Sequence, residues 1–296
     1  MINYFATQTR KSPINLAIAR VILSVSIIWK LVMYEWRAYP SWPTKLGYDN
    51  ILPVFGSTPL FTHIQAVSLI CILLLLSFLI GYKIKITAWS SAALLTYLGG
   101  VRIHWYGSHQ TELLFTGSLL LLLFAIFAEE DVLSVDQLKR SQITSLDGLT
   151  DLYTQKKQYD HRALKWALVV IGFHYFGSGL YKLVWGDPIR WIQPASLARY
   201  IHFYNTEVYS WFAGEILLQY PILLTIGAVL AITLEVGFLP CILSRRPIWP
   251  FFVGLFGFHT AVVIYMGPNF FDLVLLFGLF FPWDTLLHWH CLVKSD

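Results

Sequence analysis

The chain has 296 residues, of which 56% are hydrophobic and only 13% are charged. Soluble domains carry roughly 25% charged residues, so this composition argues against that class. The net charge of +4 is small, and the basic residues are scattered in short connections between apolar runs, so we expect no nucleic-acid partner. The sequence predicts an integral membrane protein in contact with lipid.

Long apolar runs recur along the chain. A membrane-spanning helix needs about 20 such residues, so they predict an all-α polytopic bundle of about eight transmembrane helices. We expect these near residues 14–36, 64–82, 84–101, 112–128, 163–185, 215–243, 247–267 and 270–289. The sixth is overlong and contains Pro221, which predicts a kink or an interfacial start. Residues 1–296 are thus expected to form a single transmembrane domain.

Lysine and arginine residues are distributed unequally between the connections on the two sides of the predicted bundle. With a cytoplasmic N-terminus, 12 lie in inner connections and 5 in outer ones. The positive-inside rule therefore predicts cytoplasmic N- and C-termini. The only long polar stretch, residues 129–162, is predicted to be a cytoplasmic connecting loop in which Ser145 and Asp147 could cap a short helix.

The predicted outer connections, residues 36–62 and 186–214, are rich in aromatic side chains. Two interpretations remain open. These residues can form the aromatic belt that is usual at a membrane surface. Alternatively, they shape the mouth of a ligand cavity.

Ionisable residues at membrane depth mark internal cavities, proton paths or ligand sites. Arg20, Glu235 and His259 each lie several residues from the ends of their predicted spans. We expect all three to face the interior, with Arg20 and Glu235 forming an ion pair. No group of residues has metal-ligand spacing, and the three cysteines lie in or beside apolar segments, so no metal site is predicted.

Lys182 follows a glycine-rich stretch at 172–179 that lets neighbouring helices approach closely. It lies near the outer end of the fifth span, and His109 lies near the outer start of the fourth. We expect Lys182, His109 and His174 to line one extracytoplasmic cavity. Burial there disfavours the ammonium and would let Lys182 act as a base. The alternatives are a snorkelling lysine and an interfacial histidine.

Short motifs in a fixed order resemble the HTTM superfamily, the membrane domain shared by vitamin K-dependent γ-glutamyl carboxylases and their bacterial and archaeal relatives. The resemblance covers nearly the whole chain. Its motifs are Ser12-Pro13-Ile14-Asn15-Leu16-Ala17-Ile18-Ala19-Arg20, Gly81-Tyr82, Ser108-His109, Leu133-Ser134-Val135-Asp136, Gly179-Leu180-Tyr181-Lys182-Leu183 with Trp191 following, Leu234-Glu235-Val236-Gly237 and Gly257-Phe258-His259.

The resemblance implies that Lys182 is the base that deprotonates a quinol, reduced vitamin K or menaquinone, with His109 assisting. Oxygen and carbon dioxide would be co-substrates in the carboxylation of glutamate in a peptide. The quinol cavity would be lined by Arg20, His174, Tyr181, Glu235 and His259. Such a protein would lie in a bacterial or archaeal plasma membrane with its site on the extracytoplasmic side.

The sequence departs from the carboxylase pattern in two ways. Tyr106-Gly107-Ser108 replaces an asparagine-rich sequence, and Tyr181 replaces the first of two paired lysines. The chain also has no large lumenal portion after the eighth span, so we expect it either to bind a quinone without carboxylating a substrate or to act on a peptide that a separate subunit presents. An alternative function is a non-catalytic membrane factor that assists the maturation or export of a secreted peptide.

Overall fold

The computed structural model describes the chain in segments separated by gaps. They are residues 13–34, 36, 62–106, 112–131, 133–141, 162–184, 187–207, 212–244, 246–266 and 271–284. Within these segments every regular element is a helix, and no strand occurs. The prediction of an all-α protein is therefore confirmed for this part of the chain.

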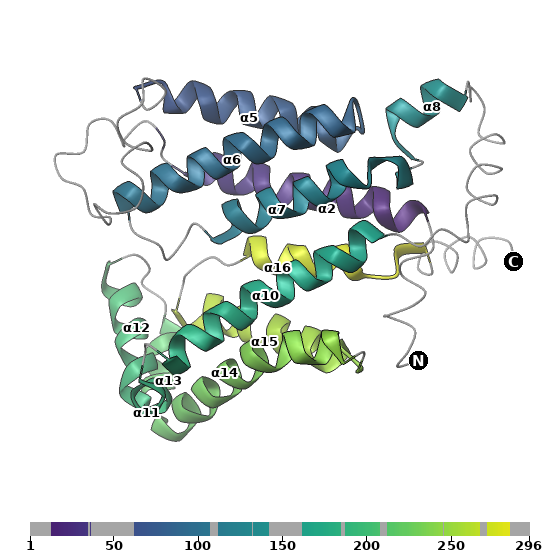
Figure 1. Ribbon diagram of the computed structural model, residues 1–296. Helices are drawn as coiled ribbons and strands as arrows, with labels where there is room; N and C mark the ends of the chain where they lie inside the picture. Colours follow the sequence, from purple (N-terminus) through teal and green to yellow (C-terminus); the bar gives the residue numbers. More distant parts are fainter. Residues whose placement is uncertain are drawn as a thin grey trace, which may run out of the picture. The chain divides into compact units, whose positions relative to one another are not determined.

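Three helices are long and apolar enough to cross a membrane, α2 (Pro13–Met33), α10 (Arg162–Val184) and α14 (Pro221–Leu243). They match the first, fifth and sixth predicted spans. Apolar but shorter segments are α5 (Ile64–Leu79), α7 (Glu112–Ile126) and α15 (Trp249–Met266). The structure thus supports a helical membrane protein (Figure 1).

Two predicted spans are interrupted. The sixth divides into α13 (Phe212–Leu218) and α14, because Pro221 begins α14. Proline is favoured at the first position of a helix, where its missing N–H would have no partner. In the eighth, α16 (Phe271–Phe277) passes into the short 3-10 helix η4 (Gly278–Phe280), and the helix expected over 270–289 does not continue through its described part.

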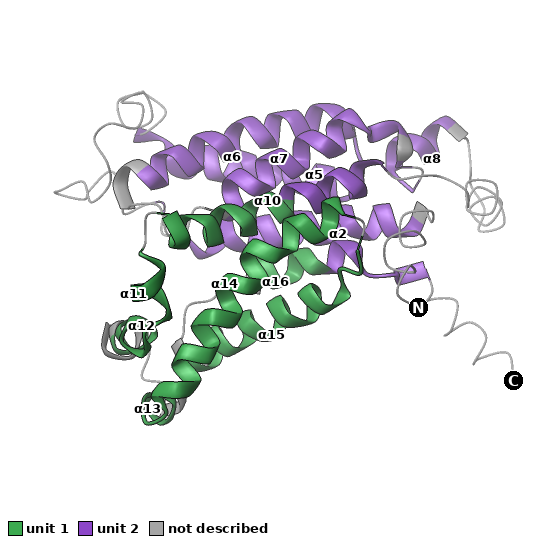
Figure 2. Ribbon diagram, turned by 60° about the horizontal axis from the view of Figure 1, so that its bottom comes forward, with its two compact units in different colours: residues 1–6, 171–277 green, residues 7–170, 278–296 purple. Residues whose placement is uncertain are grey.

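The chain divides into two compact units, which Figure 2 shows in different colours. Unit 1 contains Met1–Ala6 and Ile171–Phe277, and unit 2 contains Thr7–Val170 and Gly278–Asp296. Helix α10 contributes its first part to unit 2 and the remainder to unit 1.

In unit 2, α6 (Ile84–Tyr106) packs against both α5 and α7, and α2 contacts α5 and α7. Phe78 and Phe124 are buried in this unit, with ring centroids 5.7 Å apart in an edge-to-face arrangement. Other large apolar side chains, such as Leu73, Ile86 and Trp89, are exposed on the outside of the helices. Apolar residues on both sides of a helix are typical of a helix that contacts lipid.

In unit 1, glycines of α10 allow close approach of α14. A Cβ atom at Gly179 would lie 2.9 Å from the Cβ of Glu235, and one at Gly172 would lie 2.7 Å from Ile242 Cδ1. A Cβ at either position requires a neighbour to move, and at Gly179 the neighbours are the Glu235 Cβ and the Val236 backbone N at 3.1 Å, which cannot move without shifting α14. The close helix packing predicted from the glycine-rich stretch of α10 is therefore confirmed.

The candidate functional site

The central feature of unit 1 is an ion pair between Lys182 and Glu235. The Lys182 Nζ lies 2.5 Å from Glu235 Oε1 and also donates to Oε2. The two side chains are only 16% and 5% exposed. A second donor contact of Lys182 reaches the hydroxyl of Ser178 at 3.4 Å.

Local sequence places these groups. Tyr175, Ser178 and Lys182 are spaced by three and four residues and so share one face of α10. Gly179 lies beside this face and brings Glu235 of α14 within reach. The ion pair therefore depends on the glycine as well as on the two charged residues.

An aromatic ring lies under the lysine. Its ammonium is 5.4 Å from the ring centroid of Trp191 in α11 (Pro188–Ile192). A cation over an indole face is stabilised by the ring quadrupole. Lys182 thus contacts a carboxylate, a hydroxyl and an aromatic face.

Two turns from Lys182 along α10, Tyr175 forms a buried hydrogen bond with His259 of α15. The phenol oxygen lies 2.8 Å from His259 Nε2. The Tyr175 ring also packs edge-to-face on Phe238 and stacks on Phe277, with centroids 6.0 and 5.8 Å apart. His174 lies beside it, with its ring centroid 5.5 Å from that of Tyr175. These residues form an aromatic cluster that holds a Tyr–His pair.

The predicted site residues fall into distinct groups. Lys182 and Glu235 are in direct contact, and His174 and His259 both contact Tyr175. Tyr181 is exposed and is adjacent to Lys182 in α10. His109 lies outside the described residues, so its expected position beside Lys182 stays a prediction.

The expected ion pair between Arg20 and Glu235 is wrong. Arg20 belongs to unit 2, where its Nε lies 2.8 Å from Asp131 Oδ2, and both side chains are buried. Its other nitrogens donate to the carbonyl oxygens of Phe78, Leu79 and Leu133 at 3.0–3.1 Å. The sequence indicates that Arg20 and Glu235 lie far from the ends of their predicted spans. It does not indicate which other helices their own helices contact.

Arg20 serves as a structural anchor. The carbonyl groups of Phe78 and Leu79 belong to the last turn of α5, where carbonyl oxygens carry partial negative charge, and that of Phe78 also accepts the backbone N–H of Gly81 at 2.9 Å. The guanidinium donates to both carbonyl groups and joins α2, α5 and the segment after α7. Burial raises the pKa of the Asp131 carboxyl, while the Arg20 charge opposes this rise.

The described part of the 129–162 loop does more than connect helices. Besides the contact of Asp131, the Asp136 carboxylate in α8 (Val135–Ser141) accepts hydrogen bonds from the backbone N–H groups of Lys83 and Ile84 at 2.9 and 3.1 Å. It caps the start of α6. Ser145 and Asp147, the predicted caps, lie outside the described residues.

Sequence reasoning did not identify the role of Asp131. Glu129, Glu130, Asp131 and Asp136 occur close together, and nothing in the sequence distinguishes the buried Asp131 from the other acidic residues. Glu129, for example, is exposed and pairs with Lys85 at 3.0 Å. The signal that was available is the presence of a buried arginine that requires an acidic partner.

Among the residues that the structure describes, no group of three or more histidine, cysteine or acidic side chains could hold a metal ion. Comparison with protein-family models, curated proteins and solved structures finds no match for this chain. The fold and the site therefore define a helical membrane protein with a buried Lys–Glu pair. The family resemblance of the motifs remains a prediction.

Proposed function

We propose that the chain is a membrane enzyme of the HTTM type in which Lys182 and Glu235 accept a proton from a quinol. In this proposal it has eight spans with both termini in the cytoplasm, and the outer end of α10 opens to the extracytoplasmic side. The supporting observation is the buried contact between Lys182 and Glu235 beside the Trp191 ring. A buried ion pair at membrane depth is costly and is commonly found where protons or ligands are handled.

The residues around Lys182 suit the chemistry of a quinol such as reduced menaquinone or vitamin K. Trp191 offers an aromatic face for a flat ring, and the Lys–Glu pair offers polar groups for a hydroxyl. A bound quinol would supply an acidic hydroxyl and the electrons for reduction of oxygen. The site must therefore hold the flat ring and place the hydroxyl beside a base.

Lys182 can act as a base only after it has lost a proton. Glu235 can accept that proton, because its carboxylate is in direct hydrogen-bond contact with the ammonium. The resulting pair of amine and carboxylic acid is uncharged, which favours it in apolar surroundings. The neutral Lys182 can then take the hydroxyl proton, which leaves one added proton on the pair.

Further residues, co-substrates and a peptide acceptor complete the proposed reaction. His109 is proposed to assist Lys182, and His174, Tyr181 and His259 to line the cavity, as the motif resemblance implies. Oxygen and carbon dioxide are the proposed co-substrates, and a glutamate-containing peptide is the proposed acceptor. A secreted peptide or a separate subunit that presents it would be the partner.

The test is quinol-dependent oxygen consumption by the purified full chain with reduced menaquinone or vitamin K. Lys182→Arg keeps the positive charge but removes the base, because arginine does not deprotonate in proteins. We expect oxygen consumption to fall at least about 100-fold, within the usual contribution of a general base. The thermal unfolding midpoint should remain close to that of the wild type.

Lys30→Arg is the matched control, since Lys30 lies in α2 near the Tyr34 ring and outside the proposed site. It should retain the wild-type rate. If the wild type consumes no oxygen, or if Lys182→Arg matches it, the quinol mechanism is wrong. The alternative function, a factor for maturation or export of a secreted peptide, would then be favoured.

A further inference from the structure

A pocket of about 390 Å³ lies in unit 1 at the junction of α11 and α12 (Pro194–Glu207). Its lining includes Arg190, Trp191, Gln193, Ser196, Arg199 and Tyr200. The Trp191 and Tyr200 rings are stacked with centroids 5.8 Å apart, and the Ser196 hydroxyl donates to the Arg190 carbonyl. These contacts hold the turn between the two short helices and so fix the walls of the pocket.

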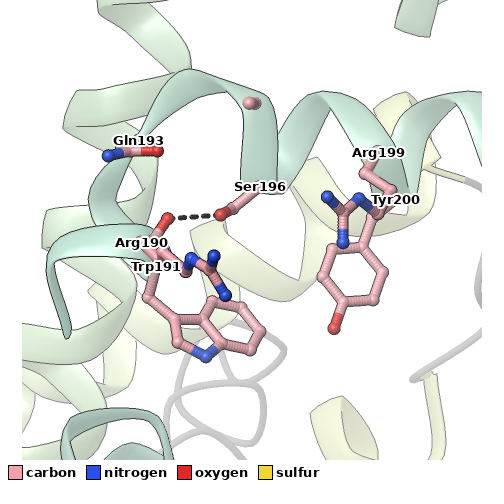
Figure 3. Close-up of a pocket in the computed structure, with 7 residues that line it drawn as sticks. Arg190, Trp191, Gln193, Ser196, Arg199 and Tyr200 are labelled. Carbon is pink, nitrogen blue, oxygen red and sulfur yellow. Dashed lines mark hydrogen bonds between the residues drawn. The ribbon is translucent and has the colours of Figure 1, made fainter. Parts of the chain in front are cut away.

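The charges of the pocket are all positive. Figure 3 shows the guanidinium groups of Arg190 and Arg199 turned toward each other across it. No described acidic side chain lines the pocket or forms a salt bridge with either arginine. The nearby Asp187 carboxylate instead accepts the backbone N–H groups of Ile189 and Arg190, which caps α11.

Both arginines are exposed, so water weakens their mutual repulsion, and an anion bound between them would be attracted by both charges. Arginine presents a planar fork of N–H donors that matches the oxygens of a phosphate. Ser196 and Gln193 supply further polar groups, and the volume is in the range of small-ligand sites. The pocket therefore has the size, charge and donors for a phosphate group.

The placement of α12 indicates where such an anion would come from. Leu197, Ala198 and Ile201 pack on an apolar cluster with Leu224 and Val262, while Arg199 is exposed. The helix follows closely on the end of α10, a helix long enough to span a membrane. Tyrosine and arginine on an amphipathic helix, with a tryptophan in the preceding α11, are typical of the membrane surface.

We propose that this pocket binds a phosphate group, carried by an anionic phospholipid headgroup or by a soluble phosphate ester. Arg190 and Arg199 grip the phosphate from two sides, and the stacked Trp191 and Tyr200 rings form the wall beside it. This binding uses neither Lys182 nor a quinol; it shares the Trp191 ring with the site around Lys182 and is tested separately from the proposed enzyme activity.

The experiment uses the full chain in detergent. Native mass spectrometry compares the binding of phosphatidylglycerol with that of phosphatidylcholine. Isothermal titration calorimetry measures the binding of glycerol phosphate. We expect preferential binding of phosphatidylglycerol, and a loss of about tenfold or more in affinity for the double variant Arg190→Gln/Arg199→Gln. Arg246→Gln removes an arginine after α14 and should leave the affinity unchanged.

The ligands separate the two sources of phosphate. Binding of phosphatidylglycerol alone assigns the pocket to a lipid headgroup, whereas binding of glycerol phosphate shows that a soluble ester suffices. Phosphatidylglycerol that binds no better than phosphatidylcholine, together with no binding of glycerol phosphate, overturns the proposal. Unchanged affinity in the double variant also overturns it. If the double variant does not fold, the single substitution Arg199→Lys replaces it as the test. Lysine keeps the positive charge but lacks the planar fork of N–H donors, so this variant must bind phosphate more weakly than the wild type.

Discussion

At the scale of single residues, burial decides how much the loss of one partner of an ion pair lowers the stability of the protein. Lys182 and Glu235 are 16% and 5% exposed, whereas Lys85 and Glu129 are 59% and 78% exposed. The Lys85 ammonium lowers the pKa of Glu129 through a hydrogen bond and its charge, yet water screens this contact. Removal of one partner from the buried pair leaves a charge that water cannot solvate.

Glu235→Gln should therefore destabilise the protein by about 3 kcal/mol, because the Lys182 ammonium loses its carboxylate in apolar surroundings. The matched control is Glu129→Gln, which should leave stability close to that of the wild type because water screens its contact with Lys85. Unfolding of both variants in detergent is followed by tryptophan fluorescence. Equal stabilities of the two variants would show that Glu235 is not buried against the lysine.

At the scale of elements, the turn between α5 and α6 requires glycine. Gly81 has a φ of +76°, a conformation that other residues rarely adopt. A Cβ there would lie 2.6 Å from Ser134 Cβ and would also meet the Arg20 guanidinium. The turn, the buried arginine and the segment after α7 are thus packed as one structure.

Gly81→Ala should lower stability by about 2 kcal/mol through backbone strain and displacement of Arg20. Gly177→Ala in α10 is the control, because a Cβ at Gly177 meets nothing within 4 Å. There, the better helix propensity of alanine should leave stability unchanged or raise it by up to about 1 kcal/mol. Thermal unfolding of the two variants tests this difference, and similar midpoints would contradict the packing at Gly81.

The sequence predicted the helical class, an irregularity at Pro221 in the form of a kink or an interfacial start, and the close packing along α10. These features depend on apolar length, on the missing N–H of proline and on the small size of glycine, all of which are local properties. The partners of Arg20 and Glu235 depend on which helices are neighbours and how each is rotated. A single sequence carries little information on how helices neighbour one another, so the predicted partner of Arg20 was Glu235, whereas the structure pairs it with Asp131.

At the scale of the whole molecule, the distribution of charge predicts its orientation. Three helices are long and apolar enough to span a membrane, and the eight-span arrangement with cytoplasmic termini rests on the 12 to 5 excess of basic residues in the inner connections. In that arrangement Arg140 lies inside, and Arg190 lies outside near the Lys–Glu pair and the anion pocket. Both proposed sites then face the same side.

Single cysteines at these two positions test the orientation in intact cells. In a background without the native cysteines, Arg190→Cys should react with a membrane-impermeant maleimide, and Arg140→Cys should react only after the membrane is opened. The expected difference follows from the positive-inside rule. Labelling of Arg140→Cys from outside would reverse the topology and place the proposed sites in the cytoplasm.

The central claim is that the Lys182–Glu235 pair accepts a proton from a quinol. Infrared difference spectroscopy on addition of reduced menaquinone, under exclusion of oxygen, observes this directly. In the proposal the ion pair is the starting state and the uncharged pair forms only as an intermediate, so proton uptake from the quinol should give a new carbonyl stretch of a protonated carboxylic acid, which Glu235→Gln abolishes. No such band in the wild type, or the same band in Glu235→Gln, would contradict proton transfer to this pair.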